Sequence, residues 1–218
     1  MERRGTLQAG GLLMPTSLDL FAYLAAFITV VLALAVSDWL QSLQKLLRAR
    51  ARVTWNLVAI LAGCLVFLAI IEEFFDLWRL VRVERYTYVD LLALLFPPIV
   101  LSIAAMTVFP DEVPAEGLDL GEYYLDNRRL VYLLLSLWVF AVFLKLTDLH
   151  ELVAGKPASF GELLSKFPWQ TVPVLLIFAL LAWSKNMRVQ LAGVIASLIL
   201  VNGSMIERSL SVLKPLGQ

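Results

Sequence analysis

Four ionisable side chains follow a long uncharged run and have the spacing of one helical face. Residues 57–71 carry no charge, and directly after them come Glu72, Glu73, Asp76 and Arg79. Glu72, Asp76 and Arg79 are separated by four and three residues, so a helix places them in one stripe. Two carboxylates one turn apart repel unless a cation, a proton or the arginine lies between them. The stripe predicts an ion- or proton-binding path, with an internal salt bridge at a helix end as the alternative.

Three further ionisable residues lie near the ends of apolar runs. Asp38 is close to the end of the run 20–40, and Lys145 and Asp148 are three residues apart at the end of the run 130–149. One interpretation places these side chains at the membrane interface, where a lysine extends toward the headgroups. In the other they face a helix bundle, and Lys145 neutralises Asp148 or one of the glutamates. We therefore include all three as candidate permeation or ion-binding residues.

Two adjacent prolines, Pro97 and Pro98, stand inside the apolar run 88–109. Because proline has no backbone N–H, the carbonyls of Ala93 and Leu94 lose their usual helical partners. Inside a bilayer a neighbouring helix, a hydroxyl group or water has to satisfy those carbonyls. The pair predicts a hinge or the wall of a site, with a packed kink as the alternative.

The composition indicates which elements position these residues. Of the 218 residues, 60% are hydrophobic and the mean hydropathy is +0.80, which is typical of a membrane protein. Lys plus Arg and Asp plus Glu are equal at 18 each, so there is no positive field of the kind that nucleic-acid binding needs. A single cysteine, Cys64, and a single histidine, His150, predict neither a disulfide nor a metal site, and no cofactor is expected.

Six apolar stretches have lengths close to the roughly 20 residues that span a hydrocarbon core as a helix. They predict an all-α integral membrane protein with about six transmembrane helices in one compact bundle and no soluble domain. We expect a flexible leader over residues 1–17, one transmembrane domain over 18–210 and a tail over 211–218. The fifth stretch is short and has Pro173 near its start, so it is open to interpretation as a half-span. The stretches are 20–40, 55–79, 88–109, 130–149, 169–184 and 189–206.

The connecting segments predict where the membrane interface lies. Residues 110–129 read as an acidic, solvated loop, and 159–167 as a short interfacial helix. Trp138 falls in mid-span and is interpreted as a packing residue, whereas five tryptophans fall at predicted span ends, where indole rings favour the headgroup level. These five are Trp39, Trp55, Trp78, Trp169 and Trp183.

Loop charge gives a weak orientation signal. For six spans, the loops after the first, third and fifth hold eight Lys and Arg residues and the opposite side holds ten. The cations that follow the first span favour an external N-terminus and a cytoplasmic 41–54 loop, in what we expect to be a bacterial cytoplasmic membrane. The near-tie leaves open dual topology or an inverted repeat, because Ser37-Asp38 and Thr147-Asp148 end corresponding spans of the two halves.

Small residues predict close helix packing. Ala22, Ala26, Thr29, Ala33 and Ser37 form a stripe at helical spacing, and Gly193 and Ser197 form a second small pair. Such surfaces pack either within the fold or between protomers.

An enzyme is not expected from these residues. The adjacent Glu72-Glu73 is similar to the paired glutamates of CAAX-type intramembrane proteases, but Leu77 stands where their arginine follows. His150 alone cannot supply that family's two histidines.

Two functions from different classes remain. The first is a permeation protein, an ion channel or small secondary transporter that moves an ion, proton or small solute along the carboxylate stripe. The alternative is a non-catalytic scaffold or partner subunit of a membrane complex. The expected partners are the lipid bilayer and either further copies of the chain or another membrane protein, with no nucleic acid.

Overall fold

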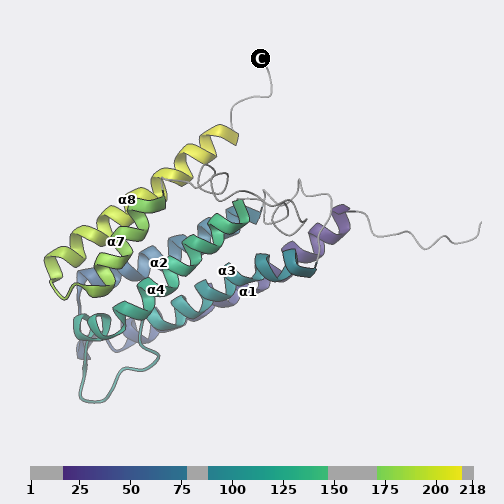
Figure 1. The fold of residues 1–218 in the computed structure, drawn as a ribbon. Coiled ribbons are helices and arrows are strands. Elements are labelled where there is room, and N and C mark those ends of the chain that lie inside the picture. The colour runs from purple at the N-terminus through teal and green to yellow at the C-terminus, as the bar shows by residue number, and fades with distance from the viewer. Residues whose placement is uncertain (1–16, 78–87, 147–170, 213–218) are drawn as a thin grey trace, which may run out of the picture.

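The computed structural model describes residues 17–77, 88–146 and 171–212, and six α-helices account for most of them (Figure 1). A 3-10 turn, η1 (Arg50–Arg52), and two short strands, β1 (Val53–Thr54) and β2 (Leu118–Asp119), complete this part of the chain. The helical class predicted from the sequence is confirmed. The helices are α1 (Ser17–Arg48), α2 (Leu57–Asp76), α3 (Tyr88–Val108), α4 (Leu120–Leu146), α7 (Val172–Trp183) and α8 (Met187–Val212).

Helix α2 lies at the centre of the bundle, in contact with α1, α3, α4 and α8. Helix α7 packs against α4 and α8, and Figure 1 shows α7 and α8, coloured green to yellow, side by side along one flank. Two helices are long and apolar enough to cross a membrane, over Ala22–Arg48 and Leu57–Asp76. Shorter apolar helices cover Leu92–Val108, Val172–Trp183 and Met187–Val201.

Two helices extend well beyond the apolar stretches that predict them. Helix α1 continues to Arg48, because Ser42 and Leu46 are buried against the rest of the bundle. Ser37 and Asp38 therefore lie inside a helix and do not end one. Helix α4 begins at Leu120, so the second half of the expected acidic loop is helical.

The ends of four helices are joined by a two-residue parallel pairing. Val53 pairs with Leu118 and Thr54 with Asp119, so the α1–α2 connection is fastened to the α3–α4 connection. Gly117 precedes β2 with a φ of +107°, a conformation that favours glycine.

Side-chain caps start the two helices that leave this pairing. The Asn56 side chain accepts hydrogen bonds from two backbone N–H groups of α2, at 2.9 and 3.3 Å. Asp119 accepts from two N–H groups of α4, at 2.7 and 3.1 Å. Each cap satisfies donors that the first helical turn leaves unpaired. A Cβ on Gly121 would lie 2.6 Å from the Asn56 amide nitrogen, so the glycine lets the two caps sit together.

A tryptophan fixes the crossing of α1 and α2. Trp39 is only 8% exposed and its indole N–H donates to the Gly63 carbonyl at 3.0 Å. Its ring packs on Phe67 and Phe109, with centroids 4.9 and 5.8 Å away. Trp39 is therefore a core packing residue within α1, whereas the sequence predicts a position at a span end. Trp55 and Trp183 are exposed at helix ends as expected; Trp78, Trp169 and the expected helix 159–167 lie outside the described residues.

The two prolines are buried within α3, which continues as one helix from Tyr88 to Val108. The Ser102 hydroxyl donates to the Pro98 carbonyl at 2.9 Å, a back-bond within the helix. Helix α3 contacts α1, α2 and α4, so the proline pair belongs to the packed interior.

Candidate functional site

A glutamate is buried in the core of the bundle. The Glu73 side chain on α2 is 1% exposed, and its Oε2 accepts a hydrogen bond of 3.0 Å from the indole N–H of Trp138 on α4. Trp138 is itself 4% exposed. The sequence predicts Trp138 to be a packing residue, and the structure adds a polar role.

Trp138, the donor to Glu73, lies midway along an uncharged stretch of α4. Residues 130–144 carry no charge, and Arg129 and Lys145 bound the stretch. Trp138 lies roughly 13 Å from the position of Arg129 and roughly 10 Å from that of Lys145 along the helix axis. The hydrogen-bonded carboxylate is therefore far from either charged end of α4.

Two more carboxylates share the last turn and a half of α2 with Glu73. Glu72 is 8% exposed and Asp76 is half-buried, and both make interactions within the structure. The neighbouring rings of Phe74 and Phe75 are exposed. Because Arg79 lies outside the described residues, the predicted stripe is described only for its two carboxylates.

Glu73, rather than Glu72, is the most buried carboxylate of α2, although the sequence interpretation gave it no separate role. A signal for it exists in the sequence. Ala62, Val66, Ala69 and Glu73 follow one another at spacings of four, three and four, and all four are buried. A glutamate that continues a line of small and apolar residues lies on the face that packs against other helices.

The other predicted site residues are not gathered at this position. Asp38 is half-buried in α1, and among the described residues it forms no hydrogen bond or ion pair with the α2 carboxylates. Pro97 and Pro98 lie in α3. Lys145 lies in the last turn of α4, and Asp148 lies outside the described residues.

A second polar cluster, which the sequence did not predict, joins α4 to the α7–α8 turn. The hydroxyls of Tyr124 and Tyr132 are 2.8 Å apart, and Tyr124 also donates to the side-chain oxygen of Gln190. Gln190 is 0% exposed, and its amide donates to the carbonyls of Leu181 and Ser184 at 2.7 Å each. These bonds hold the turn between α7 and α8 against the first part of α4.

Arg128 strengthens the same attachment. It is 5% exposed, its Nε donates to the Ser184 carbonyl at 2.9 Å, and its Nη1 donates to the Leu125 carbonyl. Burial raises the pKa of Tyr124 to about 12, although the hydrogen bond with Tyr132 and the Arg128 charge both lower it. Tyr124 is therefore a neutral hydrogen-bonding group at physiological pH. The expected solvated loop thus includes two buried residues that tie the fold together.

The chemistry available at Glu73 is proton or cation exchange. A carboxylate with an N–H donor and two neighbouring carboxylates can bind and release a positive charge. Within the described ranges, no group of three or more His, Cys, Asp or Glu residues is arranged to hold a metal ion.

The chain matches no protein-family model, no curated protein and no solved structure.

Proposed function

We propose that the chain is an integral membrane protein whose described helices lie in the bilayer, five of them long enough to span it and the 12-residue α7 crossing only part of it. Its distribution of polarity supports this proposal, because large apolar side chains cover the outside of the bundle while Glu73, Arg128 and Gln190 are buried within it. Large apolar side chains exposed on several helices of one bundle are typical of a surface that faces lipid or another protein. The exposed residues lie on five helices and include Phe27, Leu34, Leu92, Ile99, Ile103, Leu133, Phe140, Leu176 and Ile199.

The arrangement of the connections supports an alternating path through the bilayer. The β1–β2 pairing brings the first and third predicted connections together, and the Arg128–Ser184 hydrogen bond brings the fifth beside the start of α4. If these three connections, at one end of the bundle, lie on the same side of the membrane, the chain must cross the membrane an even number of times between one connection and the next. We place this end in the cytoplasm, following the cations around Lys45 and Arg48, which puts the N-terminus outside.

We further propose that the protein conducts protons, with Glu73 as the group that exchanges them. The hydrogen bond from Trp138, in the uncharged stretch 130–144 of α4, to the buried Glu73 near the C-terminal end of α2 carries this proposal. An ionisable side chain that is buried among membrane helices is costly to keep there and usually marks an ion or proton pathway. Glu72 and the half-buried Asp76 supply successive carboxylates toward one end of α2.

A hydroxyl line continues toward the other end of the bundle. Tyr132 lies six residues before Trp138 on α4, roughly 9 Å along the axis, and its hydroxyl meets that of Tyr124 at 2.8 Å. Each hydroxyl can both donate and accept a hydrogen bond, as a group that passes protons must. We therefore favour a proton over a larger solute.

Proteoliposomes that hold the purified chain and a pH-sensitive dye test the proposal. With a membrane potential imposed, wild-type liposomes should acidify or alkalinise faster than empty ones. Glu73→Gln should reduce the rate at least about tenfold, and Glu72→Gln and Asp76→Asn should reduce it less, since neighbouring carboxylates can partly replace one another. Glu116→Gln, on an exposed residue of the connection between α3 and α4, is the matched control and should leave the rate unchanged.

Two results would overturn proton conduction. The first is a wild-type rate equal to that of empty liposomes across common ions and pH gradients. The second is an unchanged rate in Glu73→Gln while the variant keeps the wild-type helical content.

A specific observation also favours the second function, a scaffold or partner subunit. The small-residue stripe of α1 faces outward, with Ala22, Ala26, Ala33 and Ser37 all exposed. A stripe of this kind lets another membrane helix approach closely. Gly193 belongs to the fold itself, because a Cβ there would lie 2.6 Å from a Leu181 methyl carbon.

Substitution of the stripe tests this function. Ala26→Leu should lower the mass of the protein–detergent complex measured by light scattering, whereas Phe27→Leu, on an exposed residue beside the stripe, should not. A wild-type chain that is monomeric in mild detergent and captures no membrane protein would contradict the subunit function.

A further inference from the structure

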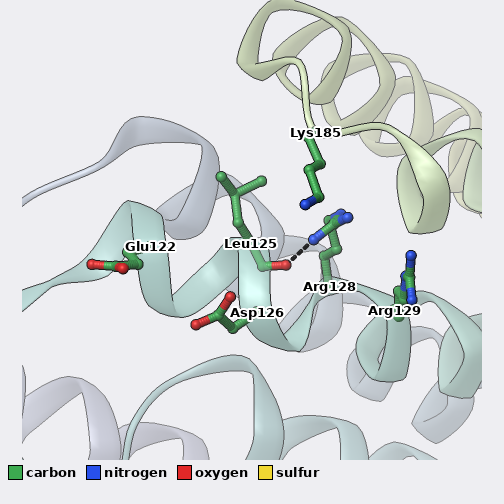
Figure 2. Close-up of a pocket in the computed structure, with 6 residues that line it drawn as sticks. All are labelled: Glu122, Leu125, Asp126, Arg128, Arg129 and Lys185. Carbon is green, nitrogen blue, oxygen red and sulfur yellow. Dashed lines mark hydrogen bonds between the residues drawn. The ribbon is translucent and has the colours of Figure 1, made fainter.

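A pocket of about 350 Å³ opens between the first part of α4 and the α7–α8 turn (Figure 2). The pocket lies at the end of the bundle where β1 pairs with β2, and it is separate from the Glu73 site. Five of its six lining residues are charged, and they come from both sides of the attachment between α4 and the turn. The lining residues are Glu122, Leu125, Asp126, Arg128, Arg129 and Lys185.

The two signs of charge are separated within the pocket. Figure 2 shows Lys185 reaching from the α7–α8 turn toward Arg128, with Arg129 beside them, while Glu122 and Asp126 lie toward the opposite side. Arg128 is fixed by its hydrogen bonds to two backbone carbonyls, which do not neutralise its charge. The pocket therefore presents a positive half, held in place by the fold, and a negative half.

Exposed apolar side chains lie on both α4 and α7, which pack against each other. Leu130 and Leu133 on α4 and Leu176 and Leu180 on α7 are exposed, and Trp183, two residues before Lys185, is 73% exposed. An exposed tryptophan beside a charged group is typical of headgroup depth in a bilayer. Exposed apolar side chains such as those of α4 and α7 contact the acyl chains of lipids in a bilayer.

We propose that the pocket binds the headgroup of a phospholipid that carries both a phosphate and a primary ammonium, as phosphatidylethanolamine does. The phosphate lies between Arg128, Arg129 and Lys185, and the ammonium faces Glu122 and Asp126. Basic pockets between membrane helices bind lipid phosphates in this way. This site rests on the proposed membrane location and is independent of proton conduction.

A bound headgroup has a structural effect. Arg129 belongs to α4 and Lys185 to the α7–α8 turn, so one phosphate between them joins the two elements. It acts beside the Gln190 and Arg128 hydrogen bonds that already hold the turn. Phosphatidylethanolamine should therefore stabilise the attachment of α7 and α8.

Native mass spectrometry of the full chain released from mild detergent tests the site, with phosphatidylethanolamine, phosphatidylcholine, phosphatidylglycerol or inorganic phosphate titrated in. We expect saturable binding of one phosphatidylethanolamine. Arg129→Gln and Lys185→Gln should each weaken it about fivefold, the effect of one cation near a lipid phosphate. Arg188→Gln is the matched control, because Arg188 is exposed at the same end and does not line the pocket.

The carboxylates determine which headgroup is preferred. Glu122→Gln with Asp126→Asn should abolish the preference for phosphatidylethanolamine over phosphatidylglycerol while binding persists. Equal binding of all three lipids to the wild-type chain, or equal weakening by Arg188→Gln, would overturn the proposal. Binding of inorganic phosphate as tight as that of the lipid would assign a free anion instead and also overturn it. A wild-type chain that conducts protons normally but binds none of the three lipids would refute this site alone.

Discussion

Trp138→Phe removes the indole N–H that Glu73 accepts, while it keeps an aromatic ring in the core. Hydrogen bonds to charged groups contribute about 1.5–3 kcal/mol to the free energy of unfolding, and the smaller ring forfeits about 1 kcal/mol more of apolar contact. Because both residues are almost fully buried, water cannot replace the lost donor. We expect Trp138→Phe to lower the free energy of unfolding by about 2.5–4 kcal/mol.

A double-mutant cycle isolates the hydrogen bond from the change in packing. Glu73→Leu removes the acceptor and keeps a similar volume, so Trp138→Phe in that background should cost about 1.5–3 kcal/mol less than in the wild type. The measurement is reversible unfolding by sodium dodecyl sulfate from mild-detergent micelles, followed by helical circular dichroism.

Additive effects, within about 0.5 kcal/mol, would refute an energetic link between Glu73 and Trp138. Trp183→Phe is the matched control, since that ring is 73% exposed and its loss of an indole should change stability by no more than about 0.5 kcal/mol.

Three further predictions concern the rest of the bundle. Gly63→Ala should destabilise the fold by about 1–3 kcal/mol in the same unfolding assay, because the added Cβ would lie 2.2 Å from the ring of Phe109. Gln190→Leu should cost about 2–4 kcal/mol and speed proteolysis of the α7–α8 turn, because it removes the partner of two carbonyls and a tyrosine. Tyr124 raises stability below pH 10, and this contribution of about 2–3 kcal/mol should be lost between pH 10 and about 12, so the wild-type melting temperature should fall more steeply there than that of Tyr124→Phe.

Each of these has its own control. Gly203→Ala meets nothing within 4 Å and should not lower stability, since alanine is the better helix former, so an equal loss at both glycines would contradict the packing argument. Gln41→Leu, on an exposed glutamine, should not speed proteolysis at the turn. Tyr23→Phe, on a residue 83% exposed, should leave the alkaline steepening in place. Parallel melting profiles of wild type and Tyr124→Phe between pH 10 and 12 would contradict the tyrosine prediction.

The positions of the helices could be predicted from the sequence, but not all of their ends. Apolar runs predict helices because the backbone hydrogen bonds of a helix join residues only four apart, and consecutive apolar side chains favour burial of the whole segment. The extension of α1 depends on Ser42 and Leu46 packing against other helices, and the early start of α4 depends on the Asp119 cap. Both are tertiary or capping effects that an apolar run does not contain.

The candidate site was only partly predictable for a similar reason. The carboxylates of α2 stand out in the sequence because charge is costly beside an uncharged run. The partner of Glu73, Trp138, lies on another helix, and no local spacing relates the two residues. Tyr124, Arg128 and Gln190 are common polar types near helix ends, so solvent exposure is the natural expectation until the fold shows them buried.

The pairing of β1 with β2 has a consequence for how the chain is made. Val53 and Thr54 are synthesised before the residues of α2, of α3 and of the segment up to Leu118. During synthesis the α1–α2 connection therefore has an open strand edge that later residues of the same chain must fill. Closure of that edge marks the moment at which the first two helical hairpins become one unit, and a chain interrupted before Asp119 would keep the edge available to chaperones or to other chains.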